Sequence, residues 1–365
     1  MNVDRFLDPL YGRIEVSSAE QALLFAPEVQ RLRYVRMCNI NSLLISGASE
    51  ISRFEHTVGV LHLAKVWAEA NSLPSRDGQI VCSAAILHDM MTGPFGHSME
   101  YVLSEQSVDG GFVHEDLSFG QGQRYFQATH ANTRFAGAPF SADTILGSNW
   151  AEVTDTIAGR GRYGPILAGS IDLDNIDNVV RLAFHVGIAD RHDAHGAVAL
   201  AERLRLVDGC LEVDAYGEEL IVAWQAIRTN LYRLLLEDSA EFSAKAMLTR
   251  MIESSVASGL IGADSWLLTD DELLARLKDE SIGESQGVGE LARRLVLGDL
   301  YYPVLLAQLP GVKPYDSVAN TVFKEYLEQE ISRELQCRII IHFIKDYGKT
   351  QRSITLGSNS LGTRR

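Results

Sequence analysis

The sequence lacks the segments that mark secreted, membrane-spanning and disulfide-rich proteins. Its four cysteines lie far apart and form no CxxC pair, so neither a zinc ribbon nor a disulfide framework is indicated. No run of about eighteen apolar residues occurs, and the first residues, MNVDRFLDP, show no basic-then-apolar leader pattern. We therefore expect a cytoplasmic protein with reduced cysteines and no membrane segment.

Positive charge is also scarce. The 33 Lys and Arg residues are outnumbered by 48 Asp and Glu residues, which gives a formal net charge of -15. Such a field repels polyanions, so nucleic acid is a disfavoured partner, and segment 345–352 is the one weak candidate for contacting it. The sequence also shows neither a P-loop nor an internal repeat.

Hydrophobic periodicity predicts a mainly α-helical protein. The 365 residues suffice for one large domain with appendages or for two domains, and 46% of them are hydrophobic. Apolar residues recur at helical spacing in five segments, namely 53–70, 80–90, 176–186, 220–236 and 244–256.

The C-terminal part predicts further helices and a small β element. Thr269 and Glu272 have the spacing of a capping box, and 318–335 has the pattern of a charged amphipathic helix. The β-branched run 337–344 predicts a strand, and we expect the tail 358–365 to be disordered.

Histidines and carboxylates stand together in segments that otherwise look like core. His88 continues an apolar stripe and is followed by Asp89, His56 lies on the preceding helix, and Asp174 opens a later helix. Two imidazoles and two carboxylates suit Mn, Fe, Co, Ni, Zn or Mg and leave positions for water and a substrate oxygen. A single His-Asp pair is more often a hydrogen-bonded pair than a metal ligand, so spacing alone leaves both interpretations open.

A longer match covers residues 8 to about 187. The segments, in order, are DPLYG (8–12), PEVQRLRYVRM (27–37), GASEISRFEHTVGVLHLA (47–64), AAILHDMMTGPFGHSME (84–100), VHE (113–115) and IDLDNIDNVVR (171–181). Together they resemble the HD-domain phosphohydrolases, specifically their deoxynucleoside triphosphate triphosphohydrolase branch. The resemblance implies an HD-domain helical core, a nucleotide substrate and one divalent metal ion.

Carried over position by position, the resemblance assigns metal ligands and catalytic residues. The implied metal ligands are His56, His88, Asp89 and Asp174. The residue matching His114 is the general acid, steered by the carboxylates matching Glu100 and Glu115, and the residue matching His97 faces the scissile phosphate. This division suits phosphoryl transfer, which needs charge stabilisation, a positioned water and a proton for the leaving oxygen.

The resemblance also assigns substrate contacts. Gln30 matches a residue that contacts the sugar hydroxyl, while Arg53 and Arg228 match phosphate-binding arginines. Asn178 stands where the family has a substrate-binding Tyr, and Tyr232 where related enzymes often place His.

The chain departs from the family at several positions. Thr92 replaces a histidine, so one imidazole near the phosphate is missing. Asn175 and Leu182 stand where the family has a basic residue and an Asp, which together with Asn178 removes a phosphate-binding cation and two sugar contacts. These departures bear on the sugar and triphosphate preferences and leave the metal ligands intact.

We expect residues 1–208 to form the HD phosphohydrolase core and 209–357 a helical C-terminal extension that packs on it. The expected function is a metal-dependent phosphohydrolase that acts on nucleotides, most simply a (deoxy)nucleoside triphosphate triphosphohydrolase that releases nucleoside and triphosphate. A phosphomonoesterase or pyrophosphatase with the same metal site and a nucleotide-sensing module without turnover remain alternatives. The family often oligomerises, so a homo-oligomer also stays open.

Overall fold

The protein is mainly α-helical, as the sequence predicts, and the strands in its described part form short antiparallel pairs. The computed structural model describes residues 4–38, 51–105, 114–115, 142–262, 265–279, 287–305, 321–343, 352–357 and 359–361. Among these residues, no helix combines the length and hydropathy needed to cross a bilayer.

The N-terminal part begins with a hairpin and continues into helices that carry several candidate site residues. Its elements are β1 (Arg5–Asp8), β2 (Gly12–Glu15), α1 (Ser18–Leu24), α2 (Pro27–Gln30), the 3-10 helix η1 (Arg31–Tyr34), α3 (Arg53–Ala70), α4 (Ser75–Leu87) and α5 (His97–Glu105). Helix α3 is the predicted buried helix. The Ser52 side chain caps it by accepting from the Glu55 N–H, and most of its side chains are buried.

The middle part adds helices around α3. Its elements are α7 (Ala142–Leu146), η4 (Gly147–Asn149), α8 (Trp150–Ile157), η5 (Gly164–Ile166), α9 (Leu173–His185), α10 (Arg191–Arg203), β3 (Arg205–Val207), β4 (Cys210–Glu212) and α11 (Ala215–Glu237). The Asp172 carboxylate caps α9 by accepting from the Asn175 N–H. Helices α4, α9 and α10 all pack against α3, so residues far apart in sequence meet on this one helix.

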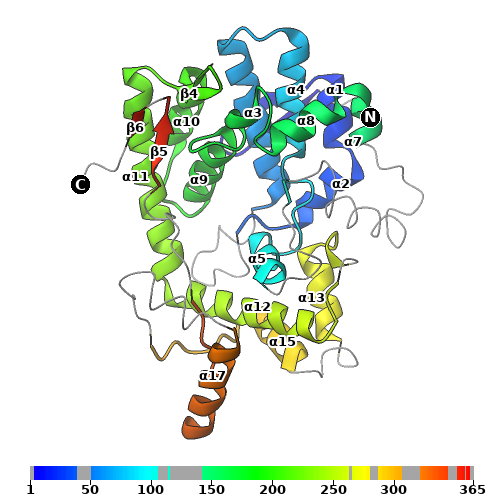
Figure 1. Ribbon diagram of the computed structural model, residues 1–365, viewed down its shortest axis with the longest axis vertical. Coiled ribbons are helices and arrows are strands. Elements are labelled where there is room, and N and C mark those ends of the chain that lie inside the picture. The colour runs from blue at the N-terminus through cyan, green and yellow to red at the C-terminus, as the bar shows by residue number, and fades with distance from the viewer. Residues whose placement is uncertain are drawn as a thin grey trace.

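The C-terminal part is also helical. Its elements are α12 (Ser239–Ala257), α13 (Asp270–Lys278), α15 (Val288–Leu297), α17 (Thr321–Leu335), β5 (Ile354–Leu356) and β6 (Asn359–Leu361). In Figure 1 the long helix α11 runs from the group around α9 down to α12, and α5 lies between these two groups of helices. The predicted capping box is confirmed, because Thr269 and Glu272 each bind the other's backbone N–H.

Contacts join the two expected parts next to the candidate site. Trp266 donates its indole N–H to the Met91 carbonyl at 2.6 Å, and Asp270 accepts from the Phe95 N–H at 2.8 Å. The segment between Asp89 and His97 is therefore held by residues just before and at the start of α13. The boundary between residues 208 and 209 remains a prediction.

The C-terminal β element differs from the expectation. Residues 337–343 form no strand, because Ile339 and Ile341 donate their backbone N–H groups to the Ser332 and Glu328 side chains of α17. The strands are instead β5 and β6, and β6 occupies residues 359–361 of the tail that we expected to be disordered. The buried side chains of Ile354 and Leu356 anchor this hairpin.

Helix α4 ends earlier than the apolar stripe predicts. We expected a helix over 80–90, whereas α4 ends at Leu87 and His88 is its C-cap residue. Asp89 lies in the turn that follows, so the direction of its side chain is not tied to that of His88 by helical geometry. This early end lets both side chains face the same point.

Candidate metal centre and catalytic site

The four predicted metal ligands converge from three parts of the chain. His56 Nε2 lies 2.9 Å from Asp174 Oδ1 and 3.3 Å from His88 Nε2, which in turn lies 3.8 Å from Asp174 Oδ1. Asp89 Oδ2 lies 3.6 Å from His88 Nε2 and 3.9 Å from His56 Nε2. His56, His88 and Asp174 have the mutual spacing of a metal-ligand set, and Asp89 adjoins them.

The hydrogen bonds of the two imidazoles fit a bound cation. His88 Nδ1 lies 2.8 Å from the Ala85 carbonyl, which can only accept, so Nδ1 carries the proton and the Nε2 lone pair faces the cluster. His56 Nδ1 lies 2.6 Å from Asp177 Oδ2 and likewise leaves Nε2 toward the centre. Metal-binding histidines characteristically donate their other ring nitrogen in this way.

The cluster attracts positive charge. Burial lowers the pKa of His56, but hydrogen bonds and charge interactions with Asp174 and Asp177 outweigh it and raise the pKa to about 9. Each ring nitrogen of His56 thus lies within hydrogen-bond distance of a carboxylate, and one of these carboxylates, Asp174, is a predicted metal ligand. A proton or a divalent cation at His56 Nε2 satisfies this arrangement, and the mixed imidazole and carboxylate donors suit the metals expected from the sequence.

Asp89 is fixed by two neighbours. Arg53 Nη1 donates to both carboxylate oxygens, at 2.8 and 2.7 Å, and Thr92 Oγ1 donates to Oδ1 at 2.8 Å. Burial alone would raise the pKa of Asp89, but the Arg53 guanidinium and the neighbouring histidines hold it well below its usual value. Asp89 is therefore ionised, and Thr92, where the family has His, orients this carboxylate. The guanidinium of Arg53, which was predicted to contact phosphate, is hydrogen-bonded to Asp89.

A buried ionic network supports His56 from behind. Asp177 binds both His56 and Arg181, and Arg181, which is fully buried, also pairs with Asp8 at 2.9 Å and Glu55 at 2.7 Å. The Arg181 guanidinium and His56 hold the pKa of Asp177 far below its usual range, against the effect of burial. The sequence predicted no role for Asp177 and Arg181. Their four-residue spacing on a buried helix was the signal that pointed to an ion pair.

The predicted catalytic residues form a second group that adjoins the first. Glu100 Oε2 lies 3.0 Å from His114 Nδ1 and 3.1 Å from His97 Nδ1. His114 Nε2 lies 3.4 Å from Glu115 Oε1 and 3.8 Å from Asp89 Oδ1, so it points toward the predicted metal centre. The structure brings all four predicted catalytic residues together.

The environment of His114 suits a proton donor. Burial lowers its pKa, but the hydrogen bond and charge of Glu100, with the charges of Glu115 and Asp89, raise it to about 9. His114 is therefore protonated at neutral pH, with Nδ1 held by Glu100 and Nε2 directed toward the Asp89 side. His97 differs, because 49% of its side chain is exposed.

The predicted substrate contacts are less closely gathered. Gln30 uses its side chain locally, with Nε2 2.6 Å from the Leu24 carbonyl and Oε1 2.9 Å from Arg33 Nε. Asn178 Oδ1 is buried and has no hydrogen-bond partner among the residues that the structure describes. Arg228 is buried on α11, and its guanidinium lies 4.3 Å from the ring centre of Tyr232.

Tyr101 is a candidate that the sequence analysis missed. Its ring stacks on His97 with centroids 5.9 Å apart, and about half of the residue is exposed. Burial of its hydroxyl, helped by the charges of Glu100, Tyr232 and Glu115, raises the pKa of Tyr101. Tyr232 of α11 thus lies within charge-interaction range of Tyr101. Only the four-residue spacing from His97 hinted at this contact.

Comparisons with known proteins agree with the resemblance. Residues 53–131 match the family model of the HD domain. The chain is 24% identical to the deoxynucleoside triphosphate triphosphohydrolase SAMHD1 homolog of Dictyostelium discoideum, over 73% of this chain and 50% of that protein. It is 33% identical to human SAMHD1, over 58% of this chain and 38% of the human protein.

The chain spans half or less of the length of these two curated relatives. Among solved structures, a phosphohydrolase from Bacteroides thetaiotaomicron superposes with a TM-score of 0.70 at 17% identity, covering 96% of this chain and 90% of that one. This likeness shows a shared fold. The predicted resemblance to the HD-domain phosphohydrolases and their triphosphohydrolase branch is confirmed.

Proposed function

Because residues 53–131 match the HD-domain model, we propose that the protein is a metal-dependent phosphohydrolase that acts on nucleotides. The favoured reaction is hydrolysis of a (deoxy)nucleoside triphosphate to nucleoside and triphosphate. The observation that carries the proposal is the meeting of two groups: His56, His88, Asp89 and Asp174 on one side, and a protonated His114 3.8 Å from Asp89 on the other.

The residues of the chain divide the work. His56, His88, Asp89 and Asp174 would hold a divalent cation, which supplies a Lewis acid for a phosphate oxygen and a more acidic bound water. Arg53 and Thr92 keep Asp89 ionised and in place, while Asp177 fixes the ring of His56.

His114 supplies the proton of the reaction. Water oxygen bonds to phosphorus, the bond from phosphorus to the leaving oxygen breaks, and the proton on His114 Nε2 passes to that oxygen. Glu100 holds Nδ1 at 3.0 Å throughout, so only Nε2 is available to donate. The proton lost by the attacking water leaves to solvent.

The choice of a nucleotide rests on similarity and on the residues of α11 and α9. The curated relatives are named as deoxynucleoside triphosphate triphosphohydrolases. Arg228 beside Tyr232 offers a cation next to an aromatic ring, and Asn178 Oδ1, which has no hydrogen-bond partner among the described residues, can accept from a substrate hydroxyl or amino group. These features suit a ligand that combines phosphate with polar rings.

One alternative keeps the metal centre and changes the bond that is cleaved. Asn175 and Leu182 replace a basic residue and an Asp of the family, and the Leu182 side chain is buried core. The sugar and phosphate contacts of the triphosphohydrolase branch are thus partly absent, which favours a phosphomonoesterase or pyrophosphatase as the second candidate.

Product analysis separates these functions. We would incubate the purified protein with Mn²⁺ and nucleoside mono-, di- and triphosphates in ribose and deoxyribose forms, and resolve the inorganic products. Triphosphate as the sole product supports the proposal, phosphate or pyrophosphate supports the alternative, and nucleotide binding without any product indicates a sensing module. The cytoplasmic location and a homo-oligomeric state remain proposals that fractionation and light scattering would test.

A further inference from the structure

The segment before and within β5 reaches back to the N-terminus of α9. We call residues 352–357 the C-terminal arm. Thr355 exchanges hydrogen bonds with Ser170 Oγ at 3.0 and 2.9 Å, and Gly357 donates its N–H to the Leu211 carbonyl at 2.9 Å. Ile354 is fully buried. These contacts hold the arm beside the segment that leads into Asp174.

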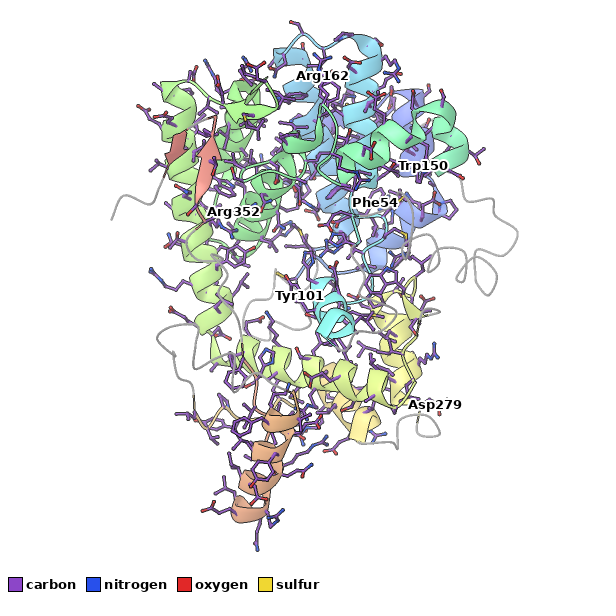
Figure 2. All side chains as sticks on the ribbon, viewed as in Figure 1. Phe54, Tyr101, Trp150, Arg162, Asp279 and Arg352 are labelled. Atoms are coloured by element: carbon purple, nitrogen blue, oxygen red, sulfur yellow. The ribbon has the colours of Figure 1, made fainter. Side chains whose placement is uncertain are left out.

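The first residue of the arm, Arg352, places its guanidinium at the N-terminus of α9. Arg352 Nη2 donates to the Gly169 carbonyl at 2.9 Å, and Nη1 donates to Asn175 Oδ1. Gln225 of α11 donates to the Arg352 carbonyl at 3.0 Å and fixes the backbone. Figure 2 shows Arg352 at the foot of β5, next to α9. Arg352 is thus bonded to the residue that directly follows the predicted metal ligand Asp174.

Arg352 differs from the other arginines near the site. Arg53 is paired with both oxygens of Asp89, and Arg181 with three carboxylates. Arg352 forms no ion pair with any residue that the structure describes, and its two acceptors are neutral. It is also only half-buried. The charge of Arg352 acts on Asp172, whose carboxylate accepts from the same Asn175 side chain, but among the described residues no carboxylate is in direct contact with its guanidinium.

A phosphate substrate needs such a charge. The site is rich in carboxylates, with Asp89, Asp174, Glu100 and Glu115 around it, and a nucleoside triphosphate brings several more negative charges. The position after Asp174 holds the neutral Asn175. A guanidinium suits phosphate because its fork matches two oxygens at once.

We propose that Arg352 is a phosphate-binding residue of this site: the C-terminal arm places beside Asn175 the cation that position 175 itself lacks. The inference rests on the proposed function, because it assumes that the ligand is a phosphate compound. If Arg352 had a purely structural role and only attached the arm to α9, its hydrogen bonds would be required and its charge would not.

Binding of inorganic tripolyphosphate in the presence of Mn²⁺ tests the proposal without turnover. We would compare the full chain with Arg352→Gln, Arg352→Lys and the matched control Ser353→Ala, whose side chain is exposed in the same arm. The melting temperature of each variant is recorded, so that a loss of folding is recognised. Charged hydrogen bonds of this kind correspond to roughly a tenfold to hundredfold change in Kd.

The expected result is that Arg352→Gln weakens tripolyphosphate binding at least about tenfold, Arg352→Lys retains most of the affinity, and Ser353→Ala leaves it unchanged. Equal binding by Arg352→Gln and the native chain overturns the inference, as does an equal loss in Arg352→Gln and Arg352→Lys, or no binding by the native chain. Nucleotide hydrolysis is measured separately. Binding that depends on Arg352 without hydrolysis contradicts the proposed function alone, and hydrolysis without that dependence contradicts this inference alone.

Discussion

The metal-binding side and the substrate side of the site are built differently. Around His56 the side chains are buried and hold one another through short hydrogen bonds that extend to Asp177 and Arg181. His97 and Tyr101, in contrast, are about half-exposed, and the ring of Tyr101 stacks on that of His97. The first arrangement fixes the positions of the charged groups, and the second leaves side chains accessible to a ligand. We therefore expect substitutions on the first side to change metal binding and substitutions on the second to change substrate choice.

His114 lies between the two sides, and its replacement gives the largest expected effect. We predict that His114→Gln lowers kcat roughly 10²- to 10⁴-fold and leaves the metal content unchanged, because Gln cannot donate a proton to the leaving oxygen. Steady-state kinetics and metal analysis measure the two quantities. His192→Gln, on the exposed surface of α10, is the matched control. Unchanged kcat in His114→Gln would remove His114 from the mechanism.

Asp177 tests whether the metal-binding side is stabilised from behind. Asp177→Asn leaves the buried Arg181 without the carboxylate that both Nε and Nη2 bind, so we expect a loss of about 3–5 kcal/mol in the free energy of unfolding. Metal affinity should fall roughly 10- to 100-fold, because His56 loses the partner that orients it. Denaturant titration and metal titration are the measurements, with Asp155→Asn at a surface ion pair as control. A stable variant with native metal affinity would show that the network is dispensable.

Trp266 tests the coupling of the C-terminal part to the site. Trp266→Phe removes the indole N–H that binds the Met91 carbonyl, and we expect a loss of about 1 kcal/mol in the free energy of unfolding. Metal content should be unchanged, because the metal-binding side keeps its own contacts. Trp150→Phe, at a half-buried position of α8, is the comparison (Figure 2). A smaller loss in Trp266→Phe than in Trp150→Phe would contradict this coupling.

The pKa of His342 is shifted in the opposite direction to that of His114. Burial, reinforced by the charges of Lys245, Lys324 and Arg250, lowers the pKa of His342 to about 3. The folded protein therefore favours neutral His342, whose contribution to stability is full above the unfolded pKa near 6.5 and is lost as pH falls toward about 3. We predict that His342→Gln makes the melting temperature less dependent on pH between 6.5 and 4. An unchanged pH slope would contradict this.

The residues of the site differ in how well they could be predicted from the sequence. His88 and Asp89 were recognisable because the motif keeps their order and the chain keeps a helix before them. Asp177 and Arg181 carried a weaker signal, since a four-residue ion pair occurs on many helices. Arg352 was noticed only as the end of the basic segment 345–352, and nothing in the sequence indicated its contact with Asn175, which spans 177 residues.

The strand predicted over 337–344 was wrong for a related reason. Its β-branched residues have strand propensity, but the side chains of α17 offered nearer acceptors for two of its backbone N–H groups. The alternation of Ile354 and Leu356 was shorter, yet both side chains are buried against the molecule. Tertiary packing decided between the two segments.

The metal content of the purified protein tests the central claim most directly. We predict about one bound divalent ion per chain after loading with Mn²⁺, measured by elemental analysis after gel filtration, and essentially none in His88→Ala or Asp174→Asn. Circular dichroism would establish that these variants remain folded. A folded double variant, His88→Ala with Asp174→Asn, that keeps one tightly bound ion would contradict the account.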